Sequence, residues 1–481
     1  MLKILDRKLE NIIKLLGLEK VMARFITEEK QKNITKSSFL HYLLLIIIVM
    51  EFIRLPDVFG LPPVYFVTGL CPLIILFDLK KLPSISPIII KIILLLLFYN
   101  VYVYLLAWGL DIQNGKSEDA ARQLGVSIKK FIQFLLFLIA CTNLIELRRV
   151  IFTITITIFI SAVFGLLTYY FGGPFEEIRD WLWQSRADLL SIATEENKGG
   201  KGQFVTGLSG VHWLFGYLMT AGPALALICG RLSRFKWLWA VIFLVMFFAL
   251  YLNGQRAAFA FSCLAIIALI IYWRLVTMPF IFIGVAFVLS IYIFSFGNTQ
   301  SAQIYHASNE ELSLLDRFSH SGHDSDDRFS WWKAGVISVI ESPWIGPTHE
   351  EYVGAFFGTK TVIVANNPDR RIPFAHNSYI NPGIYIGIIG WLIVLFYLII
   401  LKKILAQVFT AETEEKQEKI IFQGISITLL APMLNAMFQN DSIFYGEPTN
   451  VLLTGLLMSC YQIASKQNSI KNFISSKNNH A

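Results

Sequence analysis

Apolar runs long enough to cross a lipid bilayer recur along most of the chain, and this feature limits its fold more than any other. A membrane-spanning helix needs about 20 mostly apolar residues. The composition agrees, because 55% of the 481 residues are hydrophobic and only 16% are charged. With a mean hydropathy of +0.57, these values exclude an ordinary soluble enzyme, a disordered protein and a small disulfide-stapled secreted domain. The sequence therefore predicts an all-α polytopic integral membrane protein.

The apolar runs predict about twelve transmembrane helices. The expected spans cover residues 38–54, 61–79, 87–108, 127–145, 150–171, 205–229, 236–252, 256–274, 277–297, 378–401, 419–440 and 448–465. The expected organisation is an amphipathic cytosolic segment over 1–37, nine spans over 38–297, a large outer loop over 298–377, three spans over 378–465 and a cytosolic tail over 466–481. The first segment interleaves apolar residues with Lys and Arg, which favours a helix on the membrane surface over a plain solvated tail.

Charge distribution predicts the orientation of these spans. An even number of spans places both termini on one side of the membrane, and Lys and Arg are more numerous in the segments of that side. By the positive-inside rule this side is cytoplasmic. The net charge of +7 is modest. Lys129 and Lys130 depart from the bias, so they either belong to a site at the outer face or extend along their helix to the headgroups.

Polar segments between spans are expected on the outer side over residues 109–126, 172–204 and 298–377. The longest of them is long enough to be functional. Within it, Asp326 or Asp327 can cap a helix over about 328–341, and Pro343 follows its end. The His and Asp residues between 320 and 327 could hold a metal ion, but the glycine and serine among them favour a solvated loop.

Three ionisable side chains are expected at the outer ends of three different elements. Arg256 follows a short hairpin, Arg328 opens the loop helix, and His376 precedes the point where the chain re-enters the membrane. Each alone has a plain explanation, since an arginine can extend to lipid phosphates and an interfacial histidine can serve as an anchor. Together they favour a site for an anionic group, because the planar guanidinium stays charged and matches phosphate oxygens. Side chains that could join this site are His212, Trp213, Asn435, Gln439 and Asn440.

Three motifs around these residues follow the pattern of a known family. Residues 327–346 (DRFSWWKAGVISVIESPWIG) contain an arginine that begins a tryptophan-bearing helix, followed by Pro-x-x-Gly. Residues 375–379 (AHNSY) lead into a span with three glycines, and Gln255-Arg256 forms a short turn before small residues. In their order and spacing, over about 205–440, these motifs resemble the O-antigen ligase and polymerase superfamily.

The resemblance implies an inverting glycosyltransferase of the membrane-embedded C-type class. Such an enzyme takes a glycan from an undecaprenyl pyrophosphate carrier at the periplasmic face of the bacterial inner membrane, without a nucleotide sugar, cofactor or obligatory metal. By position, Arg256 and Arg328 would hold the pyrophosphate and His376 would act at the acceptor hydroxyl. His212, Asn377 and Tyr379 are the further substrate-binding candidates. The acceptor would be a glycan, lipid A-core or another hydroxyl compound, with membrane lipids as further partners and no nucleic acid.

Two other classes of function stay open at this point. A transporter or flippase for an anionic or lipid-linked substrate is compatible with twelve spans, although transporters usually place polar residues near the midplane and show repeated halves. The second class is a non-catalytic partner in envelope assembly. In that case the grouping of Arg256, Arg328 and His376 would be a coincidence. Within the enzyme class, a ligase and a polymerase need the same donor and the same cationic residues, so the sequence does not separate them.

Overall fold

The computed structural model describes residues 39–53, 55–58, 61–77, 85–114, 117–184, 205–209, 212–274, 322–344, 377–413, 415–438 and 448–478. Over these residues the regular secondary structure is entirely helical, which confirms the all-α prediction. The expected N-terminal amphipathic segment, the ninth span, His376, Gln439 and Asn440 lie outside the described residues.

The structure describes the following helices along the chain. Their bounds are α3 (Phe39–Phe52), α4 (Pro63–Phe77), α5 (Pro87–Asn114), α6 (Ser117–Ala140), α7 (Leu144–Phe171), α8 (Pro174–Trp183), η3 (Gly207–Ser209), α10 (His212–Met219), α11 (Gly222–Leu232), α12 (Lys236–Asn253), α13 (Arg256–Tyr272), α16 (Gly322–Glu341), α18 (Asn381–Ile386), α19 (Ile388–Phe409), α20 (Lys416–Asn435), η5 (Ala436–Phe438) and α21 (Pro448–Asn478). Among the described residues, 5 helical segments are long and apolar enough to cross a membrane, namely Leu144–Phe171, Trp213–Leu232, Lys236–Asn253, Ile388–Phe409 and Lys416–Phe438. This supports a multi-pass membrane protein, while the count of about twelve spans stays a prediction.

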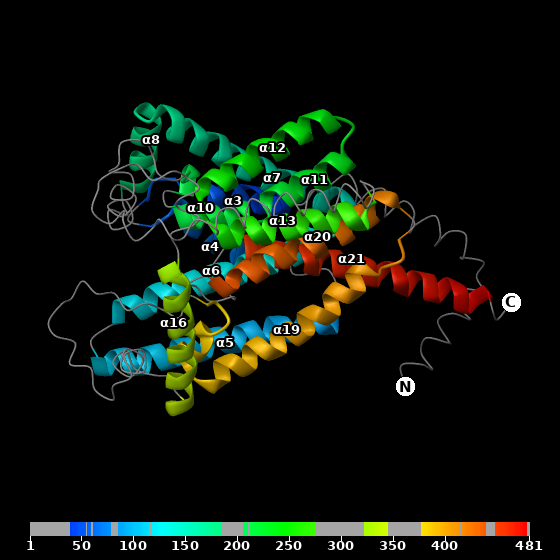
Figure 1. Ribbon diagram of the computed structural model, residues 1–481. Coiled ribbons are helices and arrows are strands. Elements are labelled where there is room, and N and C mark those ends of the chain that lie inside the picture. Colours follow the sequence, from blue (N-terminus) through cyan, green and yellow to red (C-terminus); the bar gives the residue numbers. More distant parts are fainter. Residues whose placement is uncertain are drawn as a thin grey trace, which may run out of the picture.

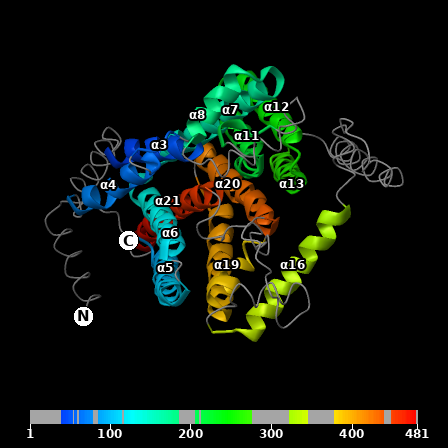
Figure 2. The ribbon, with the colours of Figure 1, turned by 90° about the vertical axis from the view of Figure 1, so that its left-hand side faces the viewer.

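Most of the long helices run side by side in one direction, and α16 lies across one end of them (Figure 1). The C-terminal end of α21, at Asn478, lies at the end of the bundle opposite to α16 (Figure 1). Figure 2 shows the bundle from the end that carries α16. In this view α16 extends from beside α13 to the start of α19. Large apolar side chains such as Leu244 and Phe396 are 61% and 54% exposed on the outward faces of the long helices. A lipid environment would cover such faces. The end marked by α16 is called the α16 end below.

Two expected spans are broken in the structure. The span expected over 205–229 consists of η3, α10 and α11, with Pro223 in the first turn of α11, a position that proline tolerates because no helical N–H is lost there. The span expected over 378–401 begins with the short helix α18 and turns at Gly387, whose φ of 69° favours glycine. Apolar composition alone does not reveal such breaks.

The segments that the sequence placed between spans are more helical than expected. Helix α16 begins at Gly322, so Asp326 and Asp327 lie inside it and the prediction that one of them caps the helix was wrong. Carboxylates in the first turns are favourable there because the helix N-terminus carries a partial positive charge. Residues 322–327 are therefore helix and not loop. The segment 109–126 is largely taken up by the ends of α5 and α6, and 172–204 contains α8.

Candidate active site

The C-terminal end of α20 with η5, residues 433–438, is the point at which the candidate elements meet. The backbone amide of Ser378 donates to the Ala436 carbonyl at 2.9 Å, and the Tyr379 hydroxyl donates to the Met433 carbonyl at 2.6 Å. The buried Asn377 side chain accepts the amide of Tyr379 at 2.9 Å through Oδ1. Asparagine favours this kind of turn because its side chain can satisfy its own backbone. The segment that directly follows His376 is thus fixed on the end of α20.

Arg256 is the first residue of α13, and a tight turn fixes its backbone. Helix α12 ends at Asn253, and Gly254 adopts a left-handed conformation with φ of 76°. The fully buried Asn253 donates through Nδ2 to the Val205 carbonyl at 2.7 Å. Residues at a helix N-terminus carry amides without an intrahelical partner, and their partial positive charge adds to that of the arginine. This end of α13 is therefore suited to bind an anion.

Helix α10, which begins at His212, packs directly on the same turn. A Cβ atom at Gly216 would overlap the side-chain oxygens of both Asn253 and Gln255, so a larger residue there would force these side chains to shift. One turn later, Thr220 donates to the Gly216 carbonyl at 2.8 Å and lies 3.3 Å from Nδ2 of Asn435, which donates to it. The α10–α11 break is thereby tied to the end of α20.

Helix α16 is docked at the same place through aromatic rings. The ring centroid of Trp332 lies 5.8 Å from that of Phe438, and Phe438 lies 6.0 Å from Phe261 of α13. Arg328 precedes Trp332 by four residues, so the two positions share one face of α16. The helix carrying Arg328 and the helix beginning with Arg256 thus contact a common residue.

The other end of α16 is held by α5 and by the turn before α19. The Pro343 carbonyl accepts the Ile388 amide at 2.7 Å, and a Cβ atom at Gly387 would overlap this carbonyl. The Tyr102 hydroxyl donates to the Trp344 carbonyl at 3.3 Å. Sequence analysis missed this docking, although Gly383 and Gly387, four residues apart in an apolar span, have the GxxxG spacing typical of close helix packing.

The structure therefore brings several of the predicted site residues together, while others lie outside the described residues. Arg256, Asn377, Tyr379 and Asn435 belong to elements that contact the end of α20. Of His212 and Arg328 the structure gives the backbone position at the start of α10 and within α16. The buried hydroxyl oxygen of Ser378 has no hydrogen-bond partner among the described residues, and sequence analysis had not singled it out. Where side chains are described, no three His, Cys, Asp or Glu residues form a metal-binding group.

The entirely helical structure of the described residues, with 5 segments long and apolar enough to cross a membrane, defines the class as a multi-pass membrane protein. Residues 241–395 match the family model described as O-Antigen ligase. The match confirms the similarity to the O-antigen ligase and polymerase superfamily, and the matched segment includes Arg256, Arg328 and His376. No curated protein matches the chain.

Proposed function

We propose that this protein is an inverting glycosyltransferase that moves a glycan from an undecaprenyl pyrophosphate carrier to an acceptor hydroxyl at the periplasmic face. The family match supports glycan transfer of the O-antigen ligase or polymerase type. One observation carries the finer proposal: three elements converge on residues 433–438. They are α13, which begins with Arg256, α16, which contains Arg328, and the segment that follows His376. Both termini would lie in the cytoplasm, with the α16 end facing the periplasm of a bacterial inner membrane.

Arg256 and Arg328 would bind the pyrophosphate of the donor. As the bond between the anomeric carbon and the pyrophosphate oxygen breaks, negative charge grows on that oxygen. Two fixed guanidinium groups then stabilise the transition state more than the ground state, which is the condition for catalysis. They supply by hydrogen bonding the charge compensation that many phosphate-transferring enzymes obtain from a metal ion, so we expect activity without an added metal.

His376 would accept the proton of the acceptor hydroxyl. The hydroxyl oxygen forms a new bond to the anomeric carbon from the side opposite the leaving pyrophosphate, which inverts the configuration at that carbon. Histidine has an ordinary pKa of about 6.5 and can accept a proton near neutral pH. Asn377 and Tyr379 follow it by one and three residues, and their hydrogen bonds support a role in holding the acceptor side of the site.

His212 would complete the site from α10. Its helix packs on the turn before Arg256, because Gly216 leaves room for the Asn253 and Gln255 side chains. A ligase and a polymerase would use these same residues, with lipid A-core or another hydroxyl compound as acceptor in the first case and a lipid-linked glycan in the second.

The experiment is a gel of surface glycans from a deletion strain complemented with the wild type, His376→Ala or Lys236→Ala. Lys236 is exposed at the start of α12, and the turn before Arg256 follows the other end of that helix, so Lys236→Ala controls for a substitution outside the proposed site. We expect Lys236→Ala to restore the wild-type ladder and His376→Ala to fail. Collapse to single repeats would identify a polymerase, and accumulation of long lipid-linked polymer would identify a ligase. An unchanged ladder in the deletion strain would contradict the proposal.

A further inference from the structure

Three arginines gather around the turn between α11 and α12, at the end of the bundle opposite to α16 (Figure 1). Arg148 lies near the start of α7, Arg231 lies in the last turn of α11, and Arg234 lies in the turn itself. Arg148 donates through Nη2 to the Leu232 carbonyl at 3.0 Å, so its guanidinium group lies directly at the end of α11. These three residues are called the α11–α12 arginines below.

Each of these guanidinium groups lies over an aromatic ring. The distances from Cζ to the ring centroid are 5.4 Å, 5.0 Å and 5.0 Å for the pairs Arg148 with Phe152, Arg231 with Trp273, and Arg234 with Phe235. A ring attracts a cation placed over its face, whereas the N–H donors of a guanidinium group lie in its own plane. The rings therefore hold the three cations and leave donors available at their edges.

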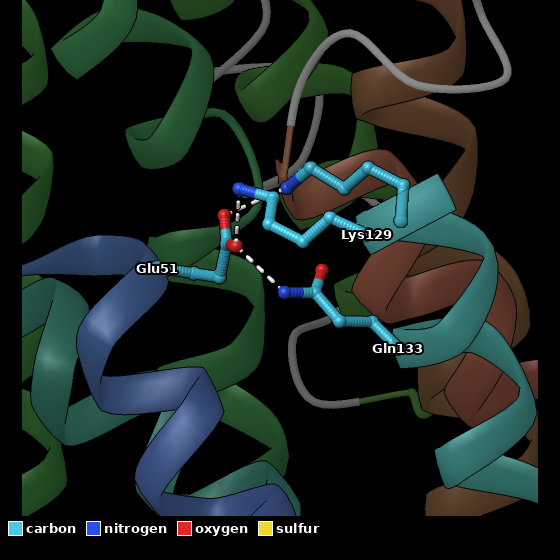
Figure 3. Close-up of polar contacts among 4 residues, drawn as sticks. Glu51, Lys129 and Gln133 are labelled. Atoms are coloured by element: carbon cyan, nitrogen blue, oxygen red, sulfur yellow. Dashed lines mark hydrogen bonds and ion pairs between the residues drawn. The ribbon is translucent and has the colours of Figure 1, made fainter. Parts of the chain in front are cut away.

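Among the described residues, no carboxylate forms an ion pair with the α11–α12 arginines. Figure 3 shows a contrasting case, in which one carboxylate of α3 is shared by three donors of α6: Glu51 accepts Lys129, Lys130 and Gln133. At the turn between α11 and α12, by comparison, three like charges accumulate where the side chains can be reached, because Arg234 is exposed and the other two are half-buried.

The usual reasons for cations at a helix end do not account for this arrangement. The positive-inside rule predicts Lys and Arg at a cytoplasmic end, and a cation near a helix C-terminus is favourable. Lysines that extend into water would satisfy both effects. Neither effect requires three arginines on aromatic rings around one turn. The arrangement instead suits phosphate oxygens, which guanidinium groups bind with paired hydrogen bonds.

An exposed apolar stripe begins beside these arginines and runs along α12. It consists of Trp237, Val241, Leu244 and Phe248, which are all exposed. Their spacing of four, three and four residues places them on one face of the helix. The distance from the first to the last is about 16 Å in an α-helix, which is about half of the ~30 Å hydrocarbon core of a bilayer. The stripe therefore has the length of an acyl chain in one leaflet.

We propose that the α11–α12 arginines bind the phosphate of an anionic phospholipid, with one acyl chain along the apolar stripe of α12. A soluble anion would leave the stripe unused, so the occupant is a lipid. Its headgroup is anionic overall, because three cations without a carboxylate repel the ammonium group of a zwitterionic headgroup. With the α16 end facing the periplasm, this lipid belongs to the cytoplasmic leaflet, where anionic lipids attract basic segments. The site does not depend on glycan transfer.

The test measures lipid binding to the purified full-length protein by native mass spectrometry, with phosphatidylglycerol as the probe and phosphatidylcholine of the same acyl chains for comparison. We expect the wild type to bind phosphatidylglycerol at least about tenfold more tightly. The double variant Arg231→Gln/Arg234→Gln should lose this preference. Lys402→Gln/Lys403→Gln removes the same charge from exposed positions in the second half of α19, which runs to the same end of the bundle, and should keep it.

A further variant keeps the test decisive if the double arginine variant does not fold. Trp237→Ser retains all three arginines but interrupts the stripe, so it should weaken phosphatidylglycerol binding. Equal binding of the two lipids by the wild type, or equal losses in the two double variants, would overturn the inference, because general charge would then explain the binding. Displacement of the lipid by glycerol 1-phosphate, or unchanged binding by Trp237→Ser, would overturn the assignment to a lipid.

Discussion

The hydroxyl of Tyr379 donates a hydrogen bond of 2.6 Å to the carbonyl of Met433. Tyr379 lies three residues after His376, and Met433 lies near the end of α20. Met433 lies in the last turn of α20, where the helix carbonyls have no intrahelical partner. The contact therefore joins the segment beside the proposed base to the helix end on which the other candidate elements meet.

Replacing this tyrosine tests whether the contact positions His376. Tyr379→Phe removes one hydrogen bond, so we expect a loss of about 0.5–1.5 kcal/mol in stability together with a clear loss of transfer rate. Tyr272→Phe is a matched control, because Tyr272 accepts a hydrogen bond from Gln423 nearer the start of α20. Thermal unfolding and transfer assays of both variants check this. Equal transfer rates in the two variants would contradict the positioning role.

Gly216 tests the approach of α10 to the turn before Arg256. A Cβ atom there would overlap Asn253 and Gln255, so Gly216→Ala should destabilise the protein by about 1–3 kcal/mol and displace the start of α13. The control is Gly69→Ala in α4, where a Cβ atom meets nothing within 4 Å. It should be neutral or stabilising by up to about 1 kcal/mol, because alanine favours helix. Thermal unfolding measures both changes, and a neutral Gly216→Ala would exclude the close packing.

Gly387 tests the docking of α16 on the start of α19. Alanine there combines a strained φ of 69° with overlap of the Pro343 carbonyl, and we expect a loss of about 1–3 kcal/mol and reduced transfer. Gly173→Ala separates the two causes, since Gly173 has φ of 45° with open space around its Cβ position. Thermal unfolding and transfer assays should show a smaller stability loss and normal transfer for Gly173→Ala. The same transfer defect in both would mean that the docking of α16 is unimportant.

Arg328→Lys tests whether the proposed pyrophosphate contact needs a planar fork. Lysine keeps the charge but cannot form the paired hydrogen bonds of a guanidinium group, so transfer should fall at least about tenfold. Lys333→Arg on the same helix has an exposed position and should behave as the wild type. Rates at saturating and at low donor concentration would show whether transition-state or ground-state binding is lost. Full activity of Arg328→Lys would reject bidentate binding.

Sequence patterns predicted the helical class, a helix in the large outer loop and the motif positions that the family match includes. These follow from apolar run length, helical periodicity and motif spacing, which are local properties, whereas the predicted cap at Asp326 or Asp327 was wrong. The breaks at Thr220 and Gly387 were not predicted, because each depends on what another helix presents at that point. The start of α16, which lies six residues before Arg328, was not predicted either.

The tertiary contacts of single polar residues were the least predictable part. From the sequence, Lys129 and Lys130 could either belong to a site at the outer face or simply extend to the lipid headgroups. Only the structure pairs them with Glu51, which lies far away in the chain on α3. Asn435 was a candidate for the site, but its contact with Thr220 could not be derived, since long-range helix pairing leaves no trace in local periodicity.

The most direct test of the central claim is an assay of glycan transfer by the purified protein, from an undecaprenyl pyrophosphate-linked donor to an acceptor. Mass spectrometry identifies the products, and the anomeric configuration of the new linkage is determined. The account predicts that the wild type releases undecaprenyl pyrophosphate and forms an inverted linkage without added metal. It also predicts that Arg256→Ala and His376→Ala each lower the rate by at least about a hundredfold while remaining folded. Transfer at the wild-type rate by both variants, or a retained anomeric configuration, would contradict it.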